Sequence, residues 1–472
     1  MAALVIFTLI GSCYDIKMRN KNQGQSPTGN KYLLCFSVFQ NIRHLIPRQP
    51  EDPKLQQLTP LHGIRTLALV CTTYAHFALL MPVFNKDPET LEKAYDGHIF
   101  YYLFFNGMMV VQIFFFLSGF LLAYLLQMNS EKIHVGWSLV PKALLLRWSR
   151  LTPVCAMMVA FIATWMRHLG SGPLWKLATT TGPTAACRTY WCSHLLYVNN
   201  LVPDNKLCMF QTWHIAADMQ MFILGVVVHV ATRNGKRALT ISLLLILGML
   251  APAIHVWLYG TRPTCLLTAQ FLRTMSDETY YYLHNRGYMN LPCFLLGMSS
   301  GYIGLNLQRK GVDLSKNRVL RFLSWWVIPL IMAVMLAGRM FASYEVQVSI
   351  WTRMAYAATH RAALGLLLSA FVLGIICRCN DLSRMLLEWP FWMVTSKLSY
   401  CVYIVHIAFL YLFLGNRQEL FPVSFINVGY ITFGGMVLSY IVAVPMYLMI
   451  EAPFGKLIQV ITEDREARNK TD

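Results

Sequence analysis

The chain has 472 residues, of which 56% are hydrophobic and only 13% are charged. Soluble domains carry about 25% charged residues, so this composition excludes an ordinary soluble protein. Together with long apolar runs it predicts an all-α, polytopic transmembrane helical bundle. The net charge of +18 does not favour nucleic-acid binding, because the basic residues are spread over many short loops rather than gathered in one patch.

Residues 1–14 are apolar but shorter than the about 20 residues that a spanning helix needs. No basic segment precedes them and no small-residue cleavage site follows, so a signal peptide is a poor fit. We expect them to be the second half of a truncated first transmembrane segment. Residues 15–60 are polar and rich in Lys and Arg, which predicts a cytoplasmic linker.

The stretch 61–80 is the first complete span, and it carries Arg65 near one end and His76 near its middle. An ionisable group inside a span is costly and marks a functional site by default. Ten residues separate the two, so an α-helix places both on one face with His76 roughly 16 Å deeper in the membrane. His76 is therefore a candidate general base. The alternative is a packing histidine bonded to a neighbouring Ser or Thr.

Further apolar runs give about ten core spans within a membrane domain of residues 61–455, followed by a charged cytoplasmic tail, 456–472. The later spans are expected near 99–127, 151–167, 210–231, 238–258, 289–307, 322–341, 359–377, 396–414 and 426–450. Basic loops alternate along the chain, which places residues 15–60 and the C-terminus in the cytoplasm of a plasma-membrane or endoplasmic-reticulum protein. If the longer loops are extracytoplasmic, disulfides are expected among their cysteines, Cys187, Cys192, Cys208 and Cys265.

Arg147 and Arg150 stand just before the predicted span 151–167, three residues apart, and so share one helix face at the membrane surface. Two guanidinium groups there suit a phosphate-rich ligand, because Arg binds phosphate bidentately. The alternative is ordinary topology-determining charge. With Arg65 at the same predicted depth, the three would hold a cytosolic ligand whose reactive arm reaches His76, and acyl-CoA has this shape.

Three further ionisable residues lie in or at the ends of predicted spans. Asp218 is about two turns inside its span, where a carboxylate usually pairs or acts, and it could orient an imidazole or a sugar-like acceptor. Glu451 ends the last span and is either an interfacial anchor for a loop Arg or part of a site. His406 lies among aromatic residues that more often form packing surface. The sequence Cys-Arg-Cys at 377–379 lacks a second ligand pair, so no metal site is predicted.

The same residues belong to motifs that follow one another in a characteristic order. They are Arg65 with His76, FFFLSGF at 114–120, RWSRLTP at 147–153, WHIAADMQ at 213–220, GMSSGY at 297–302, LSYCVYIVH at 398–406 and Glu-Ala-Pro at 451–453. This ordered set resembles the acyltransferase type 3 family of integral-membrane proteins, and most of all its animal branch named for nose resistance to fluoxetine.

The resemblance implies a ten-helix core that moves an acyl group from cytosolic acyl-CoA to a hydroxyl group of an extracytoplasmic or lumenal acceptor or lipid. No permanently bound cofactor is implied. His76 and Asp218 would be the catalytic residues. Arg65, Arg147 and Arg150 would serve the acyl-CoA donor, and Asp218 would replace the acidic residue of the family's tryptophan motif.

The chain departs from the family pattern at two places, both near the expected acceptor side. Met289 stands where the branch usually has an Arg, and residues 213–218 read Trp-His-Ile-Ala-Ala-Asp instead of Trp-Tyr-Leu-Ala-Asn-Asp. Two alternatives to the enzyme therefore stay open. One is a lipid- or drug-handling transporter that keeps the fold without the reaction, since ionisable groups mark transport paths too. The other is a receptor or scaffold.

Overall fold

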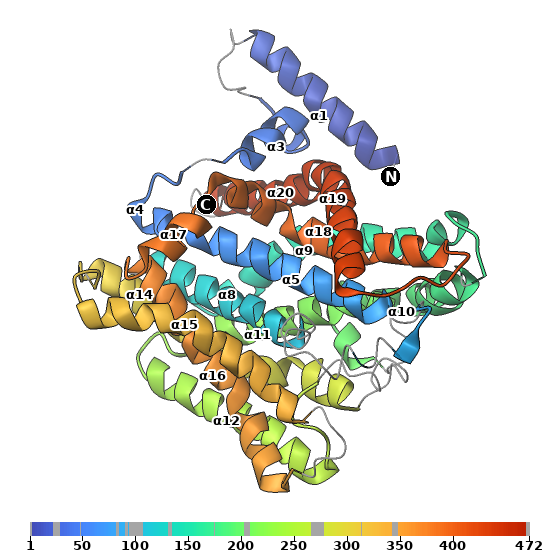
Figure 1. The fold of residues 1–472 in the computed structure, drawn as a ribbon. Coiled ribbons are helices and arrows are strands. Elements are labelled where there is room, and N and C mark those ends of the chain that lie inside the picture. The colour runs from blue at the N-terminus through green and yellow to red at the C-terminus, as the bar shows by residue number, and fades with distance from the viewer. Residues whose placement is uncertain are drawn as a thin grey trace.

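The structure is a computed structural model. It describes residues 2–21, 29–47, 49–81, 85–89, 93, 107–130, 135–173, 175–202, 208–265, 278–312, 314–341 and 348–468. These residues form helices joined by turns, together with one isolated bridge between Asn85 and Phe421. Nine helical segments of this described part are long and apolar enough to cross a membrane. The predicted polytopic helical bundle is thus confirmed (Figure 1).

The bundle is built from ten long helices. They are α5 (Pro60–Leu80), α8 (Gly107–Met128), α9 (Leu139–Thr164), α11 (Trp213–Ala231), α12 (Arg237–Tyr259), α14 (Leu291–Arg309), α15 (Arg318–Ala337), α16 (Ile350–Ile376), α18 (Pro390–Gly415) and α19 (Phe425–Met446). Each corresponds to one predicted span, although residues 99–106 of the second predicted span lie outside the described residues.

Shorter elements connect and flank these helices. Near the N-terminus they are α1 (Ala2–Lys21), α2 (Lys31–Leu34), α3 (Val38–Leu45) and α4 (Pro53–Gln56). Later come η2 (Met166–His168), η3 (Lys176–Thr184), α10 (Ala185–Leu195), η4 (Asn199–Leu201), η6 (Phe210–Thr212), η7 (Thr279–His284), η8 (Gly287–Asn290), η9 (Gly338–Phe341), α17 (Asp381–Leu387), η10 (Tyr447–Glu451) and α20 (Ala452–Arg468).

Helix α9 begins at Leu139, about three turns before the predicted start at residue 151. Arg147 and Arg150 therefore lie inside the helix rather than ahead of it. The predicted span started too late, because Arg147 and Arg150 were placed at the membrane surface, ahead of the apolar run. A long helix tolerates Arg147 because Asp218 of α11 forms an ion pair with it, which offsets the cost of taking a guanidinium out of water.

Among the ten bundle helices described above, α14 is the one that is not among the nine apolar segments, and other helices enclose it. It packs against α8, α12 and α16, and its backbone approaches α8 closely. A Cβ atom added to Gly297 would lie 2.1 Å from the carbonyl oxygen of Phe116, and one added to Gly119 would lie 2.1 Å from that of Phe294. Small residues at such crossings let two helix backbones meet. A helix shielded in this way needs no lipid-facing apolar stripe.

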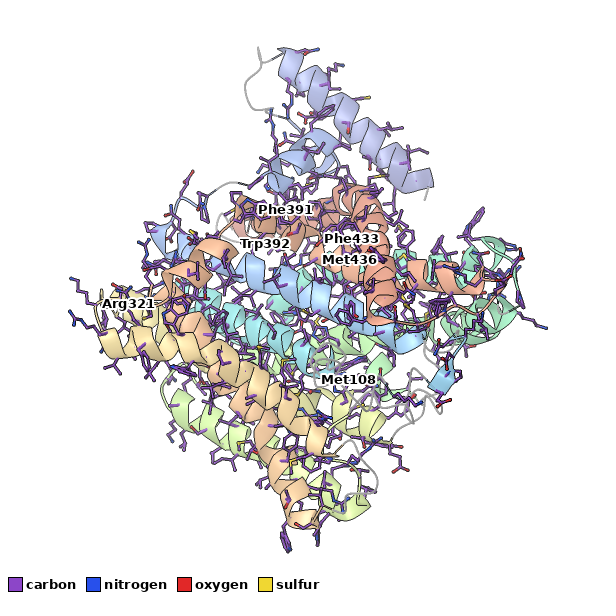
Figure 2. The ribbon with its side chains drawn as sticks, in the orientation of Figure 1. Met108, Arg321, Phe391, Trp392, Phe433 and Met436 are labelled. Carbon is purple, nitrogen blue, oxygen red and sulfur yellow. A yellow bond between two sulfur atoms is a disulfide. The ribbon has the colours of Figure 1, made fainter. Side chains whose placement is uncertain are left out.

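The outer helices present apolar side chains to their surroundings. On α19, Phe433 is 72% exposed whereas Met436, three residues on, is 8% exposed and faces the bundle (Figure 2). At the start of α18, Phe391 is likewise exposed (Figure 2). An apolar surface of this extent matches lipid rather than water, as expected for a multi-pass membrane protein.

Helices α1, α2 and α3 lie beside η10 and α20 at one edge of the bundle (Figure 1). The hydroxyl of Tyr32 donates to Asp464 Oδ2 at 2.8 Å. Helix α1 continues past the apolar stretch 1–14, because Asp15 is buried and accepts hydrogen bonds from Arg19 at 2.8 Å and Ser37 at 2.6 Å. The predicted linker therefore starts inside a helix, and it contacts the C-terminal helix with which it was predicted to share a side of the membrane.

One disulfide forms among the described loop cysteines. It joins Cys187 of α10 to Cys208, which stands two residues before η6. Cys192 and Cys265, the other two cysteines considered from the sequence, form no disulfide with any described residue. The bond ties α10 to the segment that leads into α11.

Candidate active site

Helix α5 carries both residues singled out from the first span, Arg65 and His76, on one continuous helix as predicted. Each meets a different set of partners. His76 belongs to a histidine cluster, defined here as His76, His214 and His406. Arg65 belongs to an arginine cluster, defined as Arg65, Arg147, Arg150, Asp218 and Glu451.

The histidine cluster is centred on a direct contact between His76 of α5 and His406 of α18. His76 Nδ1 lies 2.8 Å from His406 Nε2, within hydrogen-bonding distance, and the two rings stack with centroids 5.1 Å apart and an interplanar angle of 13°. His406 is fully buried, and its Nδ1 has no hydrogen-bond partner among the described residues. His406, predicted to be either a packing residue or a site residue, therefore contacts the candidate base.

Aromatic rings hold His76 on its other sides. The ring of Phe210 lies edge-on at 5.4 Å, and that of Tyr403 is tilted at 6.3 Å. The hydroxyl of Tyr403 donates to the Gln211 carbonyl at 2.6 Å and so fixes that ring. These contacts limit the imidazole to a narrow range of orientations.

His76 also lines a small cavity, of which about 20 Å³ is open to the centre of a water molecule. That is room for about one water. The other lining residues come from α5, α8, α11 and η7: Thr72, Ala75, Met108, Val111, Trp213, Tyr280 and His284. One nitrogen of the His76 imidazole thus contacts His406, and the side chain also borders this cavity.

The arginine cluster is built around an ion pair between Arg147 of α9 and Asp218 of α11. The same Nη2 atom of Arg147 lies 3.5 Å from the hydroxyl of Ser118, and its guanidinium stacks over the Phe222 ring at 4.2 Å. Asp218 was predicted to orient an imidazole or an acceptor, but the structure places its carboxylate on Arg147. The second oxygen of that carboxylate is buried without a hydrogen-bond partner.

Arg65 lies within electrostatic range of the other four members of this cluster. Arg150 is exposed and Glu451 is buried, so the cluster extends from the surface to the interior. Glu451 stands in the π-helical turn η10 and accepts a hydrogen bond from the thiol of Cys401 at 3.1 Å. Such π-turns often mark functional positions. Three guanidinium groups from α5 and α9 thus meet two carboxyl groups.

The two clusters adjoin along α11. His214 lies one turn before Asp218 on that helix and interacts electrostatically with Asp218, with Arg147 and, on the other side, with His76. Its ring packs 4.6 Å from Phe115. The sequence analysis did not single out His214. The four-residue spacing to Asp218 would have placed it on the same helix face.

The structure shows what residues of two of the sequence motifs contact. In FFFLSGF, Phe115 packs on His214, Ser118 approaches Arg147 and Gly119 admits the backbone of α14. In LSYCVYIVH, Cys401 donates to Glu451 and His406 meets His76. These two motifs therefore supply either a cluster member or a direct contact to one.

A larger pocket lies elsewhere, against α17 and the start of α18, with a volume of about 750 Å³. It contains no member of either cluster, and its charged lining includes the ion pair of Arg384 with Glu388. Within the described ranges, no three His, Cys, Asp or Glu side chains are grouped so as to hold a metal ion. The chemistry suggested by the described residues thus rests on the two clusters.

Comparison with known proteins decides the family. The acyltransferase domain model matches residues 60–448, which include every member of both clusters except Glu451. The chain belongs to the acyltransferase 3 family. No solved structure matches it.

Two curated proteins of Caenorhabditis elegans are similar to this acyltransferase 3 chain. Nose resistant to fluoxetine protein 6 is 24% identical over 99% of the chain and 60% of its own length. Regulator of hypoxia-inducible factor 1 is 23% identical over 90% of the chain and 84% of its own length. The chain thus spans about 60% of the length of the first relative.

Proposed function

We propose that this member of the acyltransferase 3 family transfers an acyl group from cytosolic acyl-CoA to a hydroxyl group of an acceptor on the opposite side of the membrane. The observation that carries the proposal is the contact of His76 with His406 next to a small cavity, about three helical turns along α5 from a cluster of three arginines. Donor binding is thereby proposed at the arginine cluster and proton transfer at the histidine cluster.

The arginine cluster suits the donor. Arg150 is exposed, and Arg65 and Arg147 lie behind it, so phosphates entering from the surface meet guanidinium groups that bind them bidentately. Asp218 holds Arg147 and stays a positioning residue rather than a catalytic one. Removing it would leave a buried charge unpaired.

The histidine pair suits the chemistry. The proposal places the proton of His406 on Nδ1 and its lone pair on Nε2, the nitrogen that faces His76. His76 Nδ1 then donates to His406 Nε2, which leaves the lone pair of His76 Nε2 free to accept a proton. His76 is thus the catalytic base and His406 orients it, the division of roles seen where a second group fixes a histidine tautomer.

In the proposed reaction His76 Nε2 takes the proton of the acceptor hydroxyl, and the oxygen of that hydroxyl attacks the thioester carbonyl. The new C–O ester bond forms, the C–S bond breaks, and the CoA thiolate leaves with the proton returned from His76. The products are an ester and CoA-SH. General-base catalysis of this kind contributes about 10²- to 10⁴-fold.

The direction across the membrane has its own support. The disulfide of Cys187 with Cys208 lies at the end of the bundle that holds the histidine cluster, because Phe210, two residues on, packs on His76. Disulfides persist outside the cytosol. The histidine end would then face the exterior or lumen, and the arginine end the cytosol.

The test uses membranes that contain the full chain, incubated with radiolabelled acyl-CoA of several chain lengths. The wild type should move label out of the CoA fraction, and His76→Ala should not. His229→Ala is the matched control. His229 is also a buried histidine, but it belongs to neither cluster, and its Nδ1 lies 2.8 Å from the Tyr302 hydroxyl. Equal transfer by wild type and His76→Ala contradicts the mechanism, and substrate flux in liposomes without acyl-CoA would favour a transporter.

A further inference from the structure

A second basic site lies on α16 and is not used by the proposed mechanism. His360 and Arg361 are neighbours on that helix and each is only 3% exposed. Arg361 donates from Nη2 to the Leu283 carbonyl at 3.1 Å, but its Nε and Nη1 are buried without a partner. No carboxylate in the described part of the chain pairs with it, which sets it apart from Arg147.

Two imidazoles flank this guanidinium. His284 and His360 both interact electrostatically with Arg361, and the Nε2 atom of each is buried without a hydrogen-bond partner. The ring of His360 stacks on Tyr356 with centroids 4.7 Å apart, and the ring of His284 packs on Trp213 at 4.5 Å. Four buried nitrogen atoms of three fixed side chains are thus left for a ligand. A buried guanidinium without an anion is costly, and an anionic ligand removes that cost.

The site adjoins the reaction cavity on the side away from the arginine cluster. His284 lines that cavity together with His76 and Trp213. Helices α5, α8 and α11 each carry one residue at the arginine cluster and another at the cavity. The residues at the arginine cluster are Arg65, Ser118 and Asp218. Those at the cavity are His76, Val111 and Trp213. A molecule that enters opposite the donor would reach Arg361 and His284 first.

We propose that Arg361, His284 and His360 bind the anionic group, a carboxylate or a phosphate, of the acceptor whose hydroxyl reaches His76. That the bound anion belongs to the acyl acceptor rests on the proposed function, whereas anion binding at these three residues does not depend on it. The acceptor class is then a hydroxyl compound that carries a negative charge. Neighbouring amides support the site, since Asn290 donates to the His284 carbonyl at 2.7 Å and receives a bond from Gln112 at 2.6 Å.

The test measures thermal unfolding of the full chain in nanodiscs of uncharged phosphatidylcholine, without acyl-CoA. Sodium acetate and inorganic phosphate are titrated against sodium chloride at equal ionic strength. The wild type should gain about 2 °C in Tm at about ten times the Kd of the bound anion. Arg361→Gln should lose this gain, Arg361→Lys should keep part of it, and Arg150→Gln, in the other cluster, should keep it for acetate.

An absent anion-specific gain in the wild type, or an unchanged gain in Arg361→Gln, overturns the proposal. If Arg361→Gln does not fold, His284→Gln and His360→Gln serve instead, and each should weaken the gain. Nanodiscs with phosphatidate separate the sources of the anion. A Tm rise without added salt assigns the site to a lipid headgroup, and an unchanged Tm assigns it to a free anion. Failure of the His76→Ala test would leave this result untouched.

Discussion

The arginine and histidine clusters each include one residue of α5, yet they satisfy their polar groups in opposite ways. The arginine cluster opposes three guanidinium groups with the carboxyl groups of Asp218 and Glu451. The histidine cluster contains no acid, and His76 and His406 satisfy each other through a single hydrogen bond. One site is arranged to carry charge and the other to exchange a proton, which is the division that a donor site and a reaction centre require.

The largest effect is expected where the charge balance of the arginine cluster is broken. Asp218→Asn leaves Arg147 partly buried beside a neutral side chain, and we expect a loss of about 3 kcal/mol in the free energy of unfolding, measured by thermal or denaturant unfolding in detergent. The double variant Arg147→Met/Asp218→Leu should recover most of it. A loss below about 1 kcal/mol for Asp218→Asn would contradict a structural ion pair.

A second change acts on the histidine side alone. The disulfide between Cys187 and Cys208 closes a separation of 21 residues and anchors the segment that brings Phe210 to His76. Replacing both cysteines with serine should cost about 3 kcal/mol and reduce acyl transfer without changing acyl-CoA affinity. Cys192→Ser, at a free exposed thiol, is the control. An equal fall in donor affinity would show that the clusters are not separate.

A low pH should also destabilise the fold at the end of the bundle that holds the histidine cluster. His194 of α10 is buried against the Thr212 hydroxyl at 3.0 Å, and burial lowers its pKa to about 4. The unfolded chain therefore binds more protons than the folded one between about pH 4 and 6.5, so stability falls as the pH drops through that window and is constant above it. This contribution of His194 is about 3 kcal/mol in full, and His194→Gln should remove it from the profile. A stability profile unchanged by His194→Gln would contradict this.

The smallest effect is expected at the exposed edge of the arginine cluster. Arg150 is solvent-exposed, so Arg150→Gln should weaken acyl-CoA binding only about fivefold, with a smaller dependence on salt than the wild type. Transfer at saturating acyl-CoA should be unchanged. A loss of transfer that saturating donor does not restore would place Arg150 in the chemistry instead.

Local sequence arguments predicted the spans and the placement of Arg65 and His76 on one helix, because helical period and span length depend only on neighbouring residues. The partners of those residues could not be predicted in this way. His406 is 330 positions from His76, and Asp218 is 71 positions from Arg147, so packing decides both contacts. The same limit explains the start of α9, where a charged stretch is helical because a distant helix supplies the counter-charge.

The most direct test of separate donor and proton-transfer sites measures acyl-CoA binding and acyl transfer on the same His76→Ala preparation in nanodiscs. We expect an acyl-CoA Kd within about twofold of the wild type, because the arginine cluster is intact, and a loss of transfer of about 10²-fold or more. Wild-type transfer by His76→Ala, or a matching loss of donor affinity, would contradict the separation of the two clusters.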